Sequence, residues 1–128
     1  MSAPTYLNFD TPDLATRLAT LDDRELDAVD FGIIGFDADT IVRRYNTTES
    51  TLAGLPRENV LGQPLFTVVA PCMNNFMVAQ RFEDAVGTGL DATIDYVLTL
   101  RMKPVKVKLR LLASPALPLR HVLVNRRP

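Results

Sequence analysis

The sequence is poor in the residues that stabilise small proteins by cross-links or metals. Its 128 residues include one cysteine, one histidine and no tryptophan. A single cysteine, Cys72, cannot form an internal disulfide, and one cysteine with one histidine excludes the usual Cys/His zinc sites. We therefore expect no metal centre, and nothing in the cysteine content indicates an oxidising compartment.

Long apolar runs and an excess of one charge are also missing. No apolar segment approaches the roughly 20 residues needed to span a bilayer, and the N-terminus lacks the basic start and apolar stretch of a signal peptide. We therefore expect a cytoplasmic protein with no membrane partner. The formal net charge is −1, so nucleic acid is not an expected partner either. The hydrophobic fraction of 47% is enough for one compact domain.

Residues 1–29 are predicted to form an N-terminal helical cap. Residues 11–13, Thr-Pro-Asp, are typical of a helix start, and a leucine stripe follows. Asp22 with Glu25 three residues later has the spacing of a second helix cap. Because such a segment is too short to fold alone, we expect it to pack on residues 30–128 within a single domain, and to be releasable.

The rest of the chain alternates between strand and helix patterns. Strands are predicted at 31–36, 40–45, 92–102, 105–112 and 119–126, and helical segments within 46–62 and at 76–86. Apolar and polar residues alternate over 105–111, which predicts one buried and one wet sheet face. The order of elements predicts an α+β domain, with a five-stranded antiparallel sheet and helices on one face. Such a layout leaves room for a small ligand between the sheet and the short helices.

Three reactive or polar side chains stand among apolar residues. Cys72 follows the run Val-Val-Ala-Pro, and Tyr45 and Glu49 lie about two dozen residues upstream. Together a thiol, a phenol and a carboxyl can hold one small molecule by a covalent bond and two short hydrogen bonds. Each also has an ordinary explanation: a small buried hydrophobe for Cys72, a core aromatic for Tyr45 and a first-turn acid for Glu49.

Several motifs between residues 12 and 127 together carry a resemblance to a known family. They are Leu26-Asp27 with Phe31-Gly32, Tyr45-Asn46 with Glu49, Gly54 with Val60 and Gly62, Val69-Ala70-Pro71-Cys72, Phe82 with Gly89, Asp95-Tyr96, Met102, Pro104 and Lys106-Val107-Lys108. On these motifs the chain resembles the photoactive yellow protein family. Its members are PAS-fold blue-light receptors that carry p-coumaric acid as a thioester.

The resemblance implies a PAS fold and a role for each of the three side chains. Cys72 would be the thioester anchor, and Tyr45 and protonated Glu49 would donate hydrogen bonds to the chromophore phenolate. Light would isomerise the chromophore, and Glu49 would give up its proton and remain as a buried, unpaired carboxylate. Relaxation of that charge would loosen the cap of residues 1–29.

The resemblance also implies which residues line the pocket and what role the protein has in the cell. The wall positions are Ile34, Ala53, Leu55, Leu65, Val69, Ala70, Pro71, Leu98, Leu100 and Met102. The implied protein is a bacterial, cytoplasmic photoreceptor for sensory transduction, a monomer or weak dimer that signals through another, unknown protein. It would not be an enzyme.

Four positions depart from the family pattern. Leu55 replaces a shielding arginine, Ala53 replaces a threonine that bonds the tyrosine, Leu100 replaces an aromatic residue, and His121 replaces a tryptophan. We expect an altered absorption maximum, a raised chromophore pKa and changed recovery kinetics. As the sole histidine, His121 could tune the pH dependence near neutrality, but a surface or edge-strand position is the favoured prediction for it.

Two other classes of function compete with a photoreceptor. A chromophore-free or differently liganded PAS sensory or docking module would be colourless when offered activated p-coumarate. An enzyme or a thiol redox sensor would use Cys72 directly. Against an enzyme, the sequence has no Gly-rich phosphate loop, no HExxH motif and no Ser/His/Asp set with a spare histidine. A redox sensor would need an accessible thiolate, whereas Cys72 lies in an apolar run.

Overall fold

The computed structural model describes residues 7–99 and 104–126. The α-helices are α1 (Leu14–Ala19), α2 (Asp23–Asp27), α3 (Thr47–Ala53) and α4 (Ala79–Asp84), and the single helical turns are η1 (Arg57–Asn59), η2 (Leu65–Val69) and η3 (Pro71–Met73). The strands are β1 (Gly32–Phe36), β2 (Val42–Tyr45), β3 (Leu90–Leu98), β4 (Val105–Ala113) and β5 (Arg120–Asn125). None of the helices in this described part is long and apolar enough to cross a membrane.

The five strands form one antiparallel sheet in the order β2-β1-β5-β4-β3. The last strand in the sequence, β5, therefore lies in the middle of the sheet. Ile34 of β1 pairs with Tyr45 of β2 and with Val122 of β5, so these three side chains lie on the same face. The predicted five-stranded antiparallel sheet of an α+β domain is confirmed.

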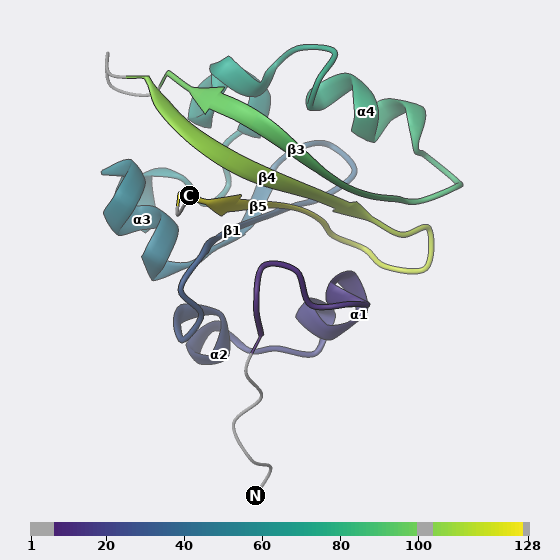
Figure 1. Cartoon of the computed structure of the whole chain (residues 1–128), viewed down its shortest axis with the longest axis horizontal. Coiled ribbons are helices and arrows are strands. Elements are labelled where there is room, and N and C mark those ends of the chain that lie inside the picture. Colours follow the sequence, from purple (N-terminus) through teal and green to yellow (C-terminus); the bar gives the residue numbers. More distant parts are fainter. Residues whose placement is uncertain (1–6, 100–103, 127–128) are drawn as a thin grey trace, which may run out of the picture.

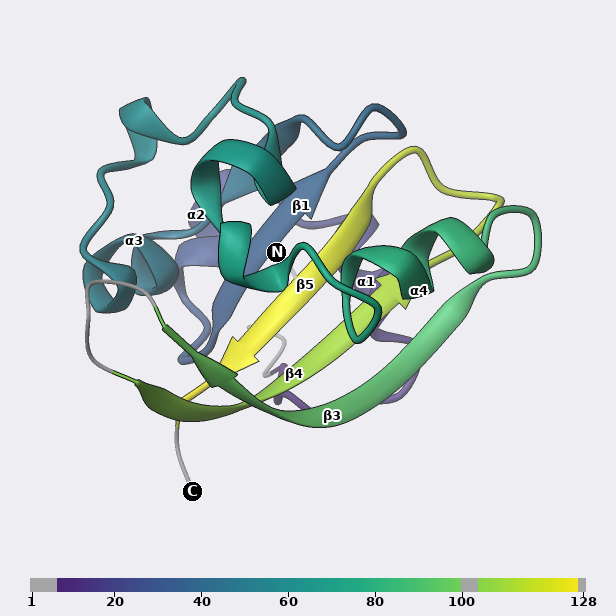
Figure 2. The ribbon, with the colours of Figure 1, turned by 90° about the horizontal axis from the view of Figure 1, so that it is seen from above.

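Helices cover the sheet on both sides. Figure 1 shows α1 and α2 below the sheet and α4 above it, and Figure 2 shows α4 and the neighbouring helical turns lying over the sheet. The layer with α4 encloses the main cluster of buried residues. This main cluster is Ile34, Phe36, Val42, Tyr45, Val60, Leu65, Phe66, Val69, Ala70, Met73, Val78, Phe82, Tyr96, Leu98, Val107, Leu109, Leu111, Val122 and Val124.

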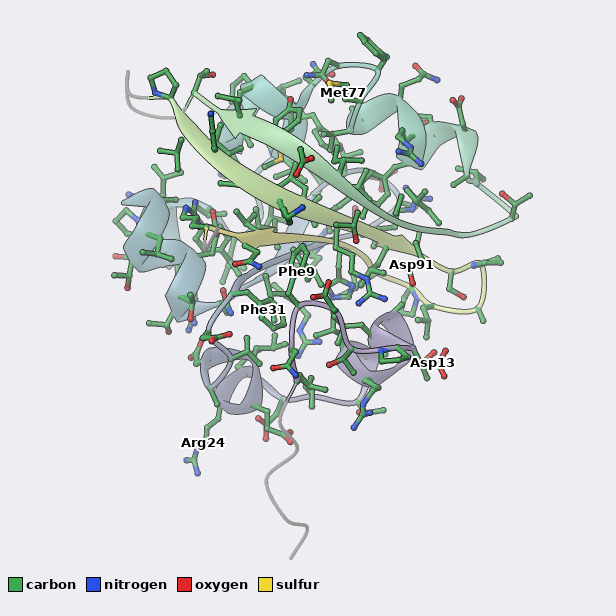
Figure 3. All side chains as sticks on the ribbon, viewed as in Figure 1. Phe9, Asp13, Arg24, Phe31, Met77 and Asp91 are labelled. Carbon is green, nitrogen blue, oxygen red and sulfur yellow. The ribbon has the colours of Figure 1, made fainter. Side chains whose placement is uncertain are left out.

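A second, smaller cluster joins the N-terminal cap, residues 7–29, to the opposite face of the sheet. Its members are Leu7, Phe9, Leu14, Leu18, Leu26, Val29, Phe31, Ile33, Leu112 and Leu123. The rings of Phe9 and Phe31 meet edge to face, with centroids 6.0 Å apart, between the cap and the sheet (Figure 3). The cap is thus held mainly by apolar burial.

Local sequence signals set several helix ends. Asp22 and Glu25 form the predicted capping box of α2, with reciprocal hydrogen bonds of 3.0 and 2.8 Å. The Asn46 side chain caps α3 by accepting a bond from the Glu49 amide. Gly54 ends α3 in the left-handed conformation, with φ of 71°, which glycine adopts without steric penalty.

Two predicted helices differ from the observed ones. The Thr11 hydroxyl does not cap α1; it accepts a bond from the Asn8 amide at 2.8 Å instead, and α1 begins only at Leu14. The helix predicted at 76–86 is shorter, and Phe76 is 79% exposed. The cause is Asn75, whose side chain accepts from the Met77 and Val78 amides and holds this segment in a turn.

Two burial predictions on the cap side of the sheet are wrong for one reason. The alternation in β4 stops at Leu109, after which Arg110, Leu111 and Leu112 are all buried. His121, predicted at the surface or an edge, is 2% exposed in central strand β5. In both cases the N-terminal cap covers the sheet face that the strand pattern alone leaves open to water.

Candidate functional site

The three candidate side chains come from separate segments of the chain. Tyr45 ends β2, Glu49 lies in the first turn of α3, and Cys72 lies in η3. Tyr45 is a buried member of the main cluster, and half-buried Cys72 packs against the same cluster. Glu49 is only 2% exposed, so the fold buries a carboxyl group on the sheet face that carries the main cluster.

Most of the predicted pocket wall lies around the same cluster. Ile34, Leu65, Val69, Ala70 and Leu98 are buried members of it, and Leu55 packs against it from its rim. Ala53 is buried but does not belong to the cluster, and Pro71 is exposed. Leu100 and Met102 lie outside the described residues.

There is room for the Glu49 carboxylate at the sheet because residue 32 is a glycine. In the sheet, Gly32 pairs with Val124 of the main cluster, so its missing side chain would point to this same face. A Cβ atom on Gly32 would overlap Glu49 Oε1 and would lie 3.0 Å from Glu49 Cδ. The carboxylate therefore occupies the volume that any other residue at position 32 would fill.

Glu49 is paired with an arginine for which the sequence predicts no role. Arg126, directly after β5, donates from Nη1 to Oε1 at 2.7 Å and from Nη2 to Oε2 at 3.0 Å. Burial raises the pKa of Glu49, and the hydrogen bonds and charge of Arg126 oppose that rise. This buried carboxylate is thus compensated by a charged partner rather than isolated.

Tyr45 is held as a neutral phenol. Burial is the largest cause of its raised pKa, the nearby negative charge of Glu49 raises it further, and Arg126 acts in the opposite direction. A neutral phenol hydroxyl can donate a hydrogen bond to a ligand oxygen.

The backbone at Cys72 is held by two polar side chains, Tyr96 of β3 and Asn75 of the loop that follows η3. The Tyr96 hydroxyl donates to the Cys72 carbonyl, and Asn75 Nδ2 lies 3.1 Å from the same carbonyl oxygen. Asn75 Nδ2 also donates to the Tyr96 hydroxyl at 2.7 Å. This triangle holds the short turn η3, and with it the Cys72 thiol, against the main cluster.

Asn46, between Tyr45 and Glu49, connects the site to the N-terminal cap. Its Nδ2 donates to the carbonyls of Leu26 and Phe31 at 2.9 and 3.0 Å, and its Oδ1 accepts from the amides of Ile33 and Glu49. These four bonds satisfy both donors and both acceptor sites of the buried Asn46 side-chain amide. One side chain therefore links the first turn of α3 to the end of α2.

Arg57 makes a second connection from the site to the cap. It donates from Nε to the Tyr45 carbonyl at 2.8 Å and from Nη2 to the Asp27 carboxylate at 2.8 Å. Asp27 also accepts from the Thr47 amide at 2.7 Å, so one carboxylate joins α2 to α3. These bonds lower the pKa of Asp27 against the opposing effect of partial burial, which is the largest single cause.

Four residues that shape the site have no role that the sequence alone predicts. Gly32 and Tyr96 stand within the quoted family motifs, so their positions, but not their contacts, were visible. Asn75 follows Cys72 by three residues, a spacing that suits a local side-chain bond to the backbone. Arg126 gave no local signal, because its partner Glu49 lies 77 residues earlier.

Comparison with known proteins identifies relatives over most of the chain. Residues 20–115 match the PAS fold family model. Photoactive yellow protein of Halochromatium salexigens is 35% identical over 106 residues, covering 82% of this chain and 85% of that protein. Photoactive yellow protein of Rhodothalassium salexigens is 31% identical over the same shares of the two chains.

A solved structure agrees with these sequence relatives. The photoactive yellow protein domain of the sensor histidine kinase Ppr from Rhodospirillum centenum superposes with a TM-score of 0.75 at 37% identity. The match covers 82% of this chain and 93% of that domain. The sequence and structural comparisons therefore identify the same kind of protein.

Proposed function

The chain belongs to the photoactive yellow protein family and has its PAS fold, and on this premise we propose that it is a blue-light photoreceptor carrying p-coumaric acid as a thioester on Cys72. One observation carries the proposal: three separate segments bring a thiol, a phenol and a buried carboxyl to one sheet face. Cys72 and Tyr45 both contact the main cluster, and Glu49 lies above Gly32 on the same face.

The chemistry of the side chains fits this group. Cys72, a half-buried residue, supplies the anchoring sulfur atom. Tyr45 supplies a neutral phenol hydroxyl, and Glu49 supplies a carboxyl whose pKa burial raises. When bound, the p-coumaroyl group supplies absorption of light and a double bond that isomerises between trans and cis.

Two residues hold the phenolic end in this proposal. Tyr45 Oη donates a hydrogen bond, and Glu49 in its protonated form donates a second one from its carboxyl oxygen. After light absorption Glu49 would pass this proton to the phenolate oxygen, and its carboxylate would then need a new partner inside the protein.

The proposed output is partial release of the N-terminal cap. Asn46 bonds at once to the Glu49 amide and to the Leu26 carbonyl, so the first turn of α3 and the end of α2 share one side chain. A change of charge at Glu49 that shifts α3 breaks these bonds and exposes the apolar cluster beneath the cap. The released surface is the signal for a separate cytoplasmic protein.

The departures at two positions set the expected spectral properties. Buried Ala53 offers a methyl group where the family has a hydroxyl, so Tyr45 loses one restraint. Leu55 places an apolar side chain at the rim of the cluster where the family has an arginine. We expect a raised chromophore pKa, an altered absorption maximum and changed recovery kinetics.

Absorption spectroscopy of the reconstituted protein tests the proposal. Purified apoprotein is mixed with activated p-coumarate, with the Cys72→Ala variant as control. A visible band that bleaches in blue light, recovers in darkness and is missing from the control supports a photoreceptor. A folded wild-type protein that keeps its free thiol and stays colourless contradicts it and favours a PAS docking module.

A further inference from the structure

The ion pair between Glu49 and Arg126 joins two distant parts of the fold. Arg126 directly follows the central strand β5, and Glu49 lies in the first turn of α3. Their two parallel bonds, of 2.7 and 3.0 Å, have the forked geometry in which arginine binds a carboxylate most strongly. The Glu49 and Arg126 side chains are only 2% and 15% exposed, so solvent screens the pair weakly.

The charges around Glu49 come from few elements. Among the described residues, the Tyr45 phenol faces it from β2, and Arg126 faces it from the end of β5. Arg126 also lines a groove together with Asp30, Thr48 and Val124. Since Tyr45 stays neutral, Arg126 provides the positive charge that directly compensates an ionised Glu49.

We propose that Arg126 is the internal counter-ion of Glu49, a positioning residue that accepts the Glu49 carboxylate as partner whenever the Glu49 proton has left. The structure already displays this arrangement, with both carboxylate oxygens bonded. The negative charge formed on Glu49 is thus not left unpaired, in contrast to the expectation from the sequence. Leu55, at the position where the family has an arginine, carries no charge that could take this role.

The pairing also suggests a route for the signal, and this part rests on the proposed function. With Glu49 protonated, Arg126 loses the full negative charge of its partner. Loss of the Glu49 proton draws Arg126 into the forked pair and ties the end of β5 to α3. The central strand therefore takes part in the light response together with the N-terminal cap.

The first test needs no chromophore. Infrared spectra of the apoprotein at neutral pH are compared with those of Arg126→Gln, and Glu49→Gln assigns any band from a protonated Glu49 carboxyl group. We expect no such band in the wild type and a clear one in Arg126→Gln, because a buried carboxyl without a counter-ion becomes neutral. Arg126→Lys keeps the charge and should remain without the band.

Matched controls separate this effect from a general loss of charge or structure. Arg24 points away from the molecule into solvent (Figure 3), so Arg24→Gln makes the same change of charge without touching Glu49. Its spectrum should match that of the wild type, and circular dichroism checks that each variant is folded. A protonated Glu49 in the wild type, or an ionised one in folded Arg126→Gln, overturns the counter-ion role.

The second test uses the reconstituted protein. If Arg126 stabilises the state with ionised Glu49, Arg126→Gln should shorten the lifetime of the light-induced state by roughly tenfold, the effect of losing a charge-assisted hydrogen bond. An unchanged lifetime overturns the proposed part of Arg126 in the response. A colourless wild type contradicts the photoreceptor proposal alone, since the infrared result stands without chromophore.

Discussion

The Glu49 carboxylate lies where the side chain of residue 32 would be, and Gly32 leaves that space open. A Cβ atom on Gly32 would overlap Glu49 Oε1 and would lie 3.2 Å from Glu49 Cβ. Because Gly32 belongs to β1 and pairs with central strand β5, the sheet cannot readily move away from the carboxylate. The Glu49 carboxylate can occupy this position because Gly32 has no side chain.

We expect Gly32→Ala to displace the Glu49 carboxylate and break its pair with Arg126. Overpacking and a lost partner for a buried charge together should lower the free energy of unfolding by about 2–4 kcal/mol. Urea denaturation followed by circular dichroism measures the loss. In the Glu49→Ala background the added methyl no longer meets Oε1, so the same substitution should cost clearly less; an equal cost in both backgrounds would show that the clash lies elsewhere.

Asn46→Ala is expected to weaken the link between the site and the cap. The substitution leaves the carbonyls of Leu26 and Phe31 and the amides of Ile33 and Glu49 without their partner. We expect a loss of about 3 kcal/mol in unfolding free energy, since each buried unpaired group is costly. Amide hydrogen exchange in α2 should accelerate more than exchange in β4, because α2 loses its bond to Asn46.

Two further substitutions show which half of the Asn46 amide matters. Asn46→Asp keeps the acceptor for the Glu49 amide but loses the donor to Leu26 and Phe31, so exchange should rise in the cap while α3 keeps its N-terminal cap. Thr48→Val removes a single bond of 2.8 Å to the Val29 carbonyl and should have a smaller effect. Equal exchange in Asn46→Asp and wild type would show that the cap is held by apolar burial alone.

Much of this architecture follows from local sequence patterns. The strand segments and the Asp22/Glu25 capping box were predicted because neighbouring residues determine them. The roles of Tyr45 and Cys72 were predicted differently, from residue-by-residue resemblance to a family. Periodicity alone would have left both as ordinary core residues.

What the sequence did not reveal depends on contacts between distant segments. His121 and Arg110 are buried because the cap covers them, and no strand pattern records what lies over a sheet face. The Glu49–Arg126 pair likewise joins an early helix to the last strand, and Arg126 by itself resembles any basic residue near a chain end. Such pairings require the tertiary structure.

His121 should make the protein less stable in mild acid. It lies against Gly35 in the middle of the sheet, its Nε2 has no hydrogen-bond partner among the described residues, and Arg44 is the nearby charge. Burial, aided by Arg44, lowers its pKa to about 4, against about 6.5 in an unfolded chain. The unfolded state therefore binds more protons between these values, and stability is lost as pH falls through this window.

The expected size of the His121 effect is about 3 kcal/mol between pH 7 and pH 4. Denaturation curves at several pH values measure it, and His121→Leu, which cannot be protonated, serves as the reference. Glu49 acts with the opposite sign, since a raised folded pKa favours the folded state at low pH. The difference between wild type and variant isolates His121; parallel pH profiles would show that its burial does not govern acid stability.

Arg110→Gln should free the first part of the cap. Arg110 donates from Nη1 to the carbonyls of Phe9 and Thr11 at 3.0 and 2.7 Å and pairs through Nε and Nη2 with Asp91. Loss of the Arg110 guanidinium and its bonds should lower the free energy of unfolding by about 2–3 kcal/mol and speed proteolysis near residues 7–12. Lys108→Gln on the same face removes an exposed pair with Asp95 and should change both by little. Equal proteolysis in the two variants would mean that apolar contacts, not Arg110, hold this segment.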